Sequence, residues 1–383
     1  MAFTDRIEGL NRWLLTDGRA APSIAEFLAG YIQQLLKTGC QIDRATIGAP
    51  LAHPVARSSY SFWLPDKPPS QQEFLWDKWG MDRLANSPMY PIYMEGRDID
   101  WRITPTAEPG EYGIGEDMRA EGFTHYFALA LPFSDGSFKA ATFQTKRPGG
   151  FDKAEMALLR ALVPALAATL EIFVHKAFAN TLMETFVGER AGKRVLNGQI
   201  HRGDGEMIRA VIWMSDIRGF TALAAHRDTA DVIDSLNRCF ETVTEAVSDS
   251  GGEVLKFIGD ALLGIFPVVG DPSDAVAQAE VALDRLSAAM DEPDWPKSLH
   301  MGVALHLGEV FYGNIGGKTR LDFTVIGPAV NLVSRVENLC SALGAPILVT
   351  RDIVELSTRT YHSRGDHAVK GVDERVEVFS PAG

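Results

Sequence analysis

The sequence predicts an α+β protein of two domains. Its 383 residues exceed the roughly 150 of a typical domain, and its 46% hydrophobic and 23% charged residues are typical of folded chains. After about residue 206, patterns for a strand, a helix, a hairpin, a helix and a strand follow one another. Before it, a helix, several strands and a second long helix succeed each other. We therefore expect helices packed on a sheet in both halves.

Charge and apolar pattern limit the partners and the location of the protein. A formal net charge of −13 argues against nucleic acid, which needs a basic surface, but a phosphate-bearing small ligand needs only a few local cations or a metal. Cys40, Cys239 and Cys340 lack metal-ligand spacing and are predicted to be small buried residues. No apolar run reaches the ~20 residues of a membrane span, and no secretory signal is evident. We expect a cytoplasmic protein with no transmembrane segment and no nucleic-acid partner.

The N-terminal half begins with a helix over 23–37. Ser23 can cap it, and its apolar side chains recur at helical spacing: Ile24, Phe27, Leu28, Tyr31 and Leu35. Strand patterns follow at 44–51 and 59–65. Apolar runs at 126–133 and 138–146 flank the turn "SDGS" and predict a hairpin.

A long helix is predicted from Lys153, because Asp152 and Glu155 form a capping-box pattern. Pro164 is placed to bend it. Its apolar residues recur at alternating four- and three-residue steps: Leu159, Val163, Leu166, Leu170, Phe173 and Ala177. Such a seam suits a parallel helix pair between two chains from about residue 166 to 186. For the first half of the helix, packing on its own domain explains the same pattern equally well.

The order helix, sheet, closing helix and the "SDGSFKAATF" hairpin resemble a GAF-type sensor domain over roughly residues 20–175. The resemblance implies a small-molecule ligand whose identity the sequence does not reveal. Six aromatic residues crowd this region and could line a pocket or serve as packing: Trp63, Trp76, Trp79, Tyr90, Tyr93 and Trp101. The histidines there, His53 and His125, lack a second ligand at metal-binding spacing.

We expect three segments along the chain. A sensor domain occupies 1–152, with its closing helix running to about residue 175. The long helix and a Gly- and charge-rich connector occupy 153–205 and are expected to dimerise. The second domain occupies 206–383.

Two acids of the second domain form a candidate metal site. An apolar strand over 210–214 ends on Asp216, and the hairpin "GGEVLKFIGDALLGIF" carries Asp260 at its tip. If these strands are sheet neighbours, the carboxylates lie close together and repel unless a cation neutralises them. Oxygen ligands favour Mg²⁺ or Mn²⁺. A Gly-Asp turn alone is usually only a turn, so the pairing with Asp216 carries this interpretation.

Five segments of the second domain, in ferredoxin-like order, resemble the catalytic domain of class III adenylate/guanylate cyclases. They are "DIRGFT", "GGEVLKFIGDALLGIF", "GEVFYGNIG", "DFTVIGPAVNLVSRVE" and "VKGVDERVEVF". The resemblance implies conversion of ATP to 3′,5′-cyclic AMP and pyrophosphate with two Mg²⁺ or Mn²⁺ ions per site. It assigns the metal ions to Asp216, Asp260 and the backbone carbonyl of Ile217.

The same resemblance assigns base recognition to Lys256 and Thr324. Lysine can donate to adenine N1 and a threonine hydroxyl can accept from the 6-amino group, whereas guanine requires an acid. Taken alone, Lys256 is a solvated lysine on an edge strand. The resemblance therefore makes ATP the expected substrate and leaves guanylate cyclase as the alternative enzyme.

The remaining site residues lie late in the chain. Asn331 and Arg335 are one helical turn apart and point from one face of a helix. The resemblance implies that this pair orients the ribose and stabilises the transition-state phosphate, and that Lys370 binds the terminal phosphates. His300 stands near a position where the family often has a phosphate-binding arginine. Glycines in "YGNIGG" (Gly313, Gly316, Gly317) are better explained by close backbone approach than by phosphate binding.

The resemblance also implies a homodimer with each site between two protomers, one giving the acids and the other the remaining residues. This chain carries both halves. The non-enzymatic alternative, a catalytically weak nucleotide-binding regulatory module, would be marked by loss of an acid or of Asn331 or Arg335, and all are present. We expect a soluble adenylate cyclase regulated by its N-terminal domain.

Overall fold

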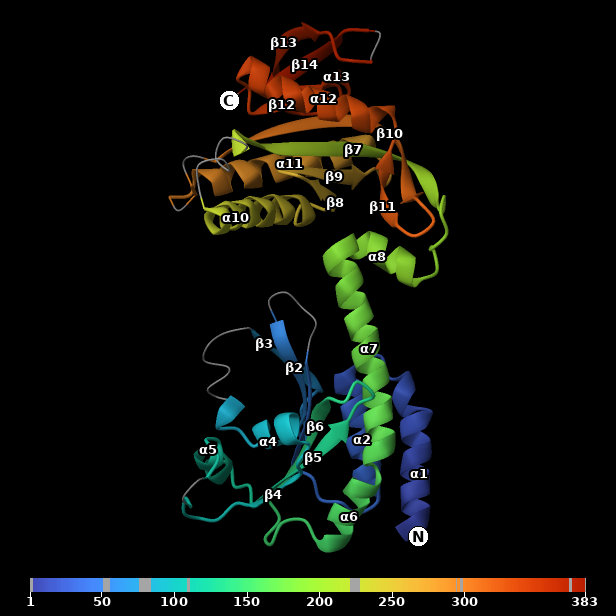
Figure 1. Cartoon of the computed structure of the whole chain (residues 1–383), viewed down its shortest axis with the longest axis vertical. Helices are drawn as coiled ribbons and strands as arrows, with labels where there is room; N and C mark the ends of the chain where they lie inside the picture. The colour runs from blue at the N-terminus through green and yellow to red at the C-terminus, as the bar shows by residue number, and fades with distance from the viewer. Residues whose placement is uncertain are drawn as a thin grey trace. The chain divides into compact units, whose positions relative to one another are not determined.

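The chain forms two compact units, residues 1–182 and 183–383, in a computed structural model (Figure 1). The structure describes residues 3–50, 56–75, 84–108, 111–220, 228–293, 295–296, 299–371 and 374–382. Each unit combines helices with its own sheet, so the predicted α+β class is confirmed. The two units are described one at a time.

The first unit is built on a six-stranded antiparallel sheet in the order β3-β2-β1-β6-β5-β4. The predicted early strands are confirmed as β1 (Arg44–Pro50) and β2 (Ala56–Trp63), and the predicted hairpin as β5 (His125–Pro132) and β6 (Phe138–Thr145). The outer strands β3 (Ser70–Leu75) and β4 (Ile99–Arg102) complete the sheet.

Helices cover both faces of this sheet. On one face lie α1 (Phe3–Leu15), a short 3₁₀ turn η1 (Gly18–Ala20), α2 (Ile24–Lys37), α6 (Lys153–Ala161) and α7 (Val163–Val187). On the other lie the short helices α4 (Tyr90–Glu95) and α5 (Gly115–Ala120). Ser23 caps α2 as predicted, because its hydroxyl accepts from the backbone N–H of Glu26 at 3.2 Å.

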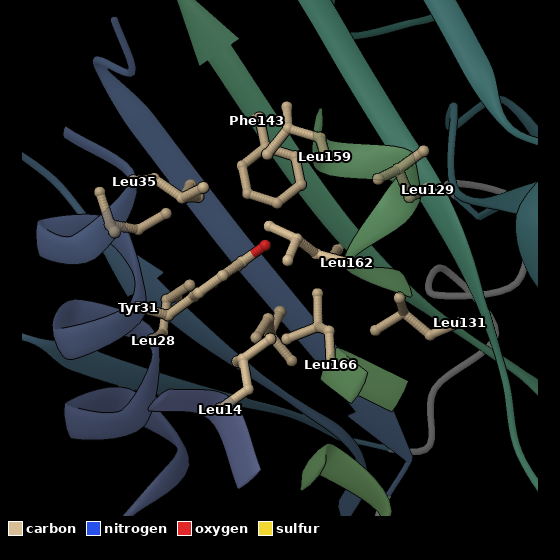
Figure 2. Close-up of a cluster of buried hydrophobic side chains, with 14 of the residues drawn as sticks. Leu14, Leu28, Tyr31, Leu35, Leu129, Leu131, Phe143, Leu159, Leu162 and Leu166 are labelled. Carbon is tan, nitrogen blue, oxygen red and sulfur yellow. The ribbon is translucent and has the colours of Figure 1, made fainter. Parts of the chain in front are cut away.

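The larger core of the first unit lies between the sheet and α2, α6 and α7 (Figure 2). Tyr31 of α2 is fully buried there, and its ring points between Phe143 of the sheet and Leu162 at the start of α7. Its hydroxyl has no hydrogen-bond partner among the described residues. Burial raises the pKa of Tyr31 far above its usual range, so the hydroxyl stays neutral.

The predicted aromatic cluster is divided by the sheet. Trp63 belongs to the larger core, whereas Tyr93 and Trp101 pack against the smaller core on the opposite face, and Tyr90 is exposed. Trp76, Trp79 and His53 lie outside the described residues. The aromatic residues that the structure describes therefore serve as packing on two faces and do not converge on one pocket.

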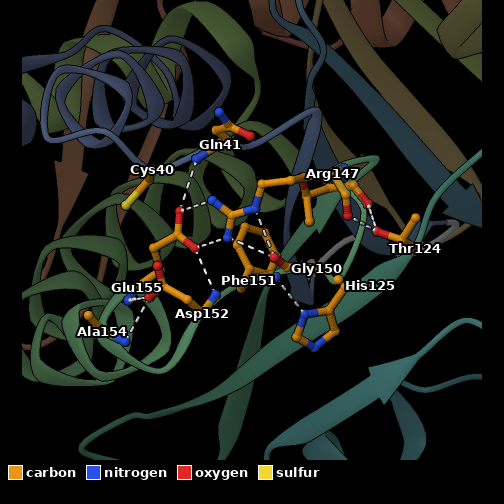
Figure 3. Close-up of polar contacts among 12 residues, drawn as sticks. Cys40, Gln41, Thr124, His125, Arg147, Gly150, Phe151, Asp152, Ala154 and Glu155 are labelled. Carbon is orange, nitrogen blue, oxygen red and sulfur yellow. Dashed lines mark hydrogen bonds and ion pairs between the residues drawn. The ribbon is translucent and has the colours of Figure 1, made fainter.

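The start of α6 is fixed by a polar network around the buried Glu155 (Figure 3). The Glu155 carboxylate accepts from the backbone N–H of Gln41 at 3.3 Å and of Asp152 at 2.8 Å, and Nη1 and Nη2 of Arg147 both donate to it. Asp152 caps the helix in return, so the predicted capping box is confirmed. His125 is buried beside this network as a neutral acceptor of the Phe151 N–H at 3.0 Å, because burial lowers its pKa.

The predicted long helix is two helices that meet at a 47° bend around Leu162. Pro164 lacks an N–H and clashes with a continuous helix, which accounts for the break. Within the described part of the chain no single helix has the length and hydropathy of a membrane span; only this bent pair passes when its two helices are taken together.

The predicted helix pair between chains is wrong for the first half of the apolar seam along α7. Leu166, Leu170 and Phe173 are buried in the core of their own unit, so they cannot form a helix pair with another chain. From Ala177 the helix is half-exposed or exposed, and Phe186 is 79% exposed. A pair between chains is therefore limited to roughly residues 177–187.

The second unit holds a sheet in the order β13-β14-β12-β10-β7-β9-β8, with β11 paired to β10. Its strands are β7 (Gly205–Arg218), β8 (Glu253–Ile258), β9 (Ala261–Pro267), β10 (His300–Gly316), β11 (Leu321–Ile326), β12 (Ile347–Thr350), β13 (Tyr361–His367) and β14 (Val376–Pro381). The central part, β10-β7-β9-β8, has the ferredoxin-like order that the sequence predicted.

Alternating side chains give this sheet two buried faces. Val211 and Trp213 of β7 face α10 (Thr229–Ser248), α11 (Pro272–Asp291) and the short α13 (Arg351–Val354). Ala210 and Ile212 face α12 (Pro328–Leu343) and α8 (Glu189–Leu196). The region predicted as an irregular connector thus contains α8, whose residue Ala191 is fully buried on the second unit. All three cysteines are buried and unbridged, as predicted.

Removing the Tyr31 hydroxyl should not destabilise the first unit. We expect Tyr31→Phe to leave the free energy of unfolding unchanged or raise it by up to about 1 kcal/mol, because a buried hydroxyl without a partner carries an uncompensated desolvation cost. Thr169→Val is the matched control: Thr169 is equally buried and donates to the Leu14 carbonyl at 3.1 Å, so its loss should cost about 1 kcal/mol. Denaturant unfolding measures both, and a clear loss in Tyr31→Phe would show that its hydroxyl is bonded.

Candidate functional site

The two predicted acids are brought together by strand pairing. β7 pairs with β9 so that Asp216 lies opposite Ala261, the residue next to Asp260. Gly259 adopts a left-handed φ of 67°, which closes the tight Gly259-Asp260 turn between β8 and β9. The observed strand is longer than the predicted one: β7 continues through Asp216 to Arg218, because it pairs with β10 along its whole length. Asp216 therefore lies within the strand, two residues before its C-terminal end.

The environment of Asp216 disfavours its charge. Burial, together with the negative charge and hydrogen bonding of Asp260, raises the pKa of Asp216 to about 6. Its Oδ1 atom is buried without a hydrogen-bond partner among the described residues. A buried, unpartnered carboxylate oxygen beside a second carboxylate fits a bound divalent cation, which would supply the missing partner and neutralise both charges.

The ligands available for such a cation are few. Within the described ranges, no group of three or more His, Cys, Asp or Glu side chains could hold a metal ion. Asp216 and Asp260 are the side chains that could hold a cation here, and the Ile217 carbonyl is the backbone oxygen next in the chain. A site of this kind leaves coordination positions for water and substrate oxygens, as Mg²⁺ usually requires.

The predicted base-reading residues lie on β8, which pairs with β9, and on β11, which pairs with β10. Lys256 is on the edge strand of the sheet, and its Nζ lies 3.7 Å from Oδ2 of Asp322 on β11. Thr324 lies two residues further along β11, on the same face of that strand as Asp322. Its side chain is 4% exposed, and its Oγ1 has no partner in the described part of the chain. The pair thus presents a fixed ammonium and an unbonded hydroxyl.

Helix α12 carries the predicted catalytic pair. It begins at Pro328, directly after Gly327, and Asn331 and Arg335 are one turn apart on it. Asn331 is exposed and Arg335 is half-buried. A Cβ placed on Gly371, whose φ is 73°, would lie 3.1 Å from Nη1 of Arg335. The loop that contains Lys370 therefore reaches the Arg335 guanidinium.

The glycine-rich segment serves backbone packing in part, as predicted. Gly313 of β10 lies opposite Gly205 of β7, and a Cβ on it would run into the Asp204 carbonyl and the Gly205 backbone. Gly316 has a φ of 148° and closes the β10–β11 turn, whereas nothing in the packing requires Gly317. His300, at the start of β10, is exposed and lies opposite Arg218.

The predicted site residues fall into three groups within one chain. The acids form one, Lys256 and Thr324 the second, and Asn331, Arg335 and Lys370 the third. Between described residues, no hydrogen bond or ion pair joins the acids to the third group. The sequence reasoning missed Asp322, which holds Lys256, and the Arg218–Glu337 ion pair behind Asp216. Strand alternation could have indicated both, since Arg218 and Asp322 each lie two residues from a predicted site residue.

Comparison with known proteins assigns the second unit to a family. Residues 206–380 match the family "Adenylate and Guanylate cyclase catalytic domain". The terminal-differentiation-specific adenylate cyclase of Dictyostelium discoideum is 35% identical over 192 residues, which are 47% of this chain and 9% of that protein. The adenylate cyclase of Anabaena cylindrica is 28% identical over 244 residues, 59% of this chain and 48% of that protein. The chain thus spans less than half the length of either relative.

Solved structures of both kinds of cyclase are similar to part of the chain. The adenylyl cyclase CyaB from P. aeruginosa is 27% identical over 46% of this chain and 95% of that chain, with a TM-score of 0.42. The guanylyl cyclase Cya2 is also 27% identical, over 47% of this chain and 94% of that chain, with a TM-score of 0.40. The GAF-like resemblance of the first unit stays a prediction. Residues 206–380, by contrast, belong to the adenylate and guanylate cyclase catalytic domain family.

Proposed function

We propose that this protein is an adenylate cyclase that converts ATP to 3′,5′-cyclic AMP and pyrophosphate. The observation that carries the proposal is a pair of buried oxygens without partners, Oδ1 of Asp216 and Oγ1 of Thr324. They belong to the residues expected to hold metal and to read the base. Buried polar atoms without partners are rare because they cost free energy, so two of them at these positions support a site completed by a metal–nucleotide ligand.

The reaction joins the ribose 3′-oxygen to the α-phosphorus and breaks the bond from that phosphorus to the bridging oxygen of pyrophosphate. The 3′-hydroxyl proton passes to solvent water, and the electron pair of the broken bond leaves with pyrophosphate. Two bound Mg²⁺ or Mn²⁺ ions would activate the hydroxyl and stabilise the charge that develops on the phosphate oxygens. Asp216, Asp260 and the Ile217 carbonyl would hold these ions in place. Asn331 orients the ribose, Arg335 donates to the α-phosphate as negative charge builds, and Lys370 binds the terminal phosphates.

Base preference follows from the donors and acceptors of the Lys256–Thr324 pair. The Lys256 ammonium has only donors and matches adenine N1, an acceptor, whereas guanine carries N1–H there. The Asp322 carboxylate lies 3.7 Å from the ammonium and pairs with it. The Thr324 hydroxyl can accept from the adenine 6-amino group. These features favour ATP, and guanylate cyclase remains the alternative that the assay below separates.

We infer a homodimer with two equivalent sites, as the family resemblance implies; within one chain, no hydrogen bond or ion pair between described residues joins the acids to the third group. Regulation by the N-terminal unit would act through the connector. Ala191 of α8 donates its N–H to Glu253 at 3.3 Å, at the start of the strand that carries Lys256, and Glu253 also accepts from Tyr312 at 2.8 Å. Arg190 reaches the Gly251 carbonyl at 3.3 Å. A movement of α8 would therefore shift β8, the strand that carries Lys256.

Substrate use tests the proposal directly. The purified chain with Mn²⁺ should form cyclic AMP from ATP faster than cyclic GMP from GTP, with products separated by chromatography. Asp216→Ala should form neither. Lys256→Glu combined with Thr324→Cys should lower the ratio of activity with ATP to activity with GTP by at least about tenfold. The double variant places an acceptor opposite adenine N1, which is itself an acceptor, and loses the threonine hydroxyl. Thr324→Ser keeps the hydroxyl and should keep the preference. An unchanged ratio in the double variant would remove both residues from base recognition.

The raised pKa of Asp216 predicts a pH-dependent effect of metal. The folded protein keeps this proton up to about pH 6, above the unfolded value, so the free energy of unfolding should fall as pH rises from about 4 to 6. Above that range Mn²⁺ should restore stability, since it replaces the proton between the two acids. We expect the rise in Tm caused by Mn²⁺ to be larger at about pH 7.5 than at about pH 5. Asp216→Asn should abolish that difference, and an equal Mn²⁺ effect at both pH values would contradict the metal site.

A further inference from the structure

An ion pair lies directly behind the candidate metal acids. Arg218 follows Asp216 by two residues on β7, so both side chains lie on the same face of the sheet. Its Nη2 donates to Oε1 of Glu337 at 2.6 Å and to the Glu337 backbone carbonyl at 3.2 Å. Glu337 is 4% exposed and lies two residues after Arg335 on α12. One guanidinium thus joins the strand of the acids to the helix of the catalytic pair.

The neighbouring strand is shaped to admit this guanidinium. Gly302 of β10 lies opposite Asp216, and any Cβ there would occupy the position of the Arg218 guanidinium. The arginine therefore crosses β10 over a residue without a side chain on its way to α12. A buried carboxylate is tolerated only with a partner, so Glu337 and Arg218 hold each other in this one arrangement.

We propose that Arg218 and Glu337 are positioning residues of the cyclase: they fix the end of β7 against α12, so that Asp216 keeps its place beside Asp260. The repulsion between the two acids acts on this strand end, and the pair resists the displacement that would relieve it. The inference rests on the proposed function, since it assumes that Asp216 is a metal ligand.

The variant Glu337→Gln tests the pair. Glutamine keeps the size and one carbonyl oxygen but loses the charge that holds Arg218. We expect Mn²⁺ affinity, measured by electron paramagnetic resonance on the full chain with unreactive 3′-deoxy-ATP, to weaken by about tenfold, and kcat with ATP to fall by a similar factor. Arg218→Gln should behave alike, and the double variant should lose little more than either single one.

Glu280→Gln is the matched control. Glu280 is equally buried at 4% exposure, pairs with Arg359 at 3.3 Å and accepts from Ser357 and Tyr361, and no described contact links it to the acids. It should lower the Tm of the protein without changing Mn²⁺ affinity. If Glu337→Gln lowers the Tm in the same way and leaves Mn²⁺ affinity intact, the pair is only structural and the inference is wrong.

Two further outcomes separate this inference from the proposed function. If the wild-type chain binds Mn²⁺ but forms no cyclic nucleotide, the proposed function fails, while the Mn²⁺ comparison still decides the role of the pair. If the wild-type chain binds no Mn²⁺, both are contradicted. Should Glu337→Gln fail to fold, Arg218→Lys replaces it, because it keeps the charge but loses the Nη2 group that donates to both the carboxylate and the backbone carbonyl of Glu337. Unchanged Mn²⁺ affinity in that variant overturns the inference.

Discussion

The mutual repulsion of Asp216 and Asp260 is the constraint on which the candidate site depends. Backbone pairing of β7 with β9 and the tight turn after Gly259 bring the acids together before any ligand is present. Burial leaves Oδ1 of Asp216 without a partner among the described residues, and burial together with the charge of Asp260 raises the pKa of Asp216 to about 6. A fold that stabilises such an arrangement by its sheet is prepared to bind a cation there, as metal-dependent phosphoryl chemistry requires.

The surrounding residues compensate for this local cost in different ways. Arg218 provides a cation beside the acids and is itself held by Glu337, across a glycine that leaves room for it. On the other side of the hairpin, Asp322 holds the Lys256 ammonium. The first pair uses no atom assigned to substrate, whereas the second uses the Lys256 ammonium that is proposed to donate to the base. The Thr324 hydroxyl has no partner among the described residues, and in the proposed function adenine would supply one.

Local sequence signals predicted much of this architecture. Three features depend on a few adjacent residues, and the structure confirms each. They are the capping box at Asp152, the hairpin with Gly259 and Asp260 at its tip, and the helix break at Pro164. The full length of β7 was not predictable, because its ends are fixed by pairing with a strand some ninety residues away. The same holds for the contacts of Lys256 with Asp322 and of Arg218 with Glu337. The apolar seam on α7 was ambiguous, because the same spacing results whether a helix packs on its own domain or against a second chain. Leu166 and Phe173 are buried, which shows that this part of α7 packs on its own unit.

The central claim is that each site combines the acids of one chain with α12 of another, and subunit mixing tests it most directly. Asp216→Ala and Asn331→Ala chains should each be inactive alone. Mixed in equal amounts with free exchange, they should regain about a quarter of wild-type cyclase activity, because half of the dimers are mixed and each holds one intact site. A mixture of Asp216→Ala with Asp260→Ala should stay inactive, since both lesions fall in the same half of the site. No recovery in the first mixture, with exchange verified by capture of differently tagged chains, would contradict the account.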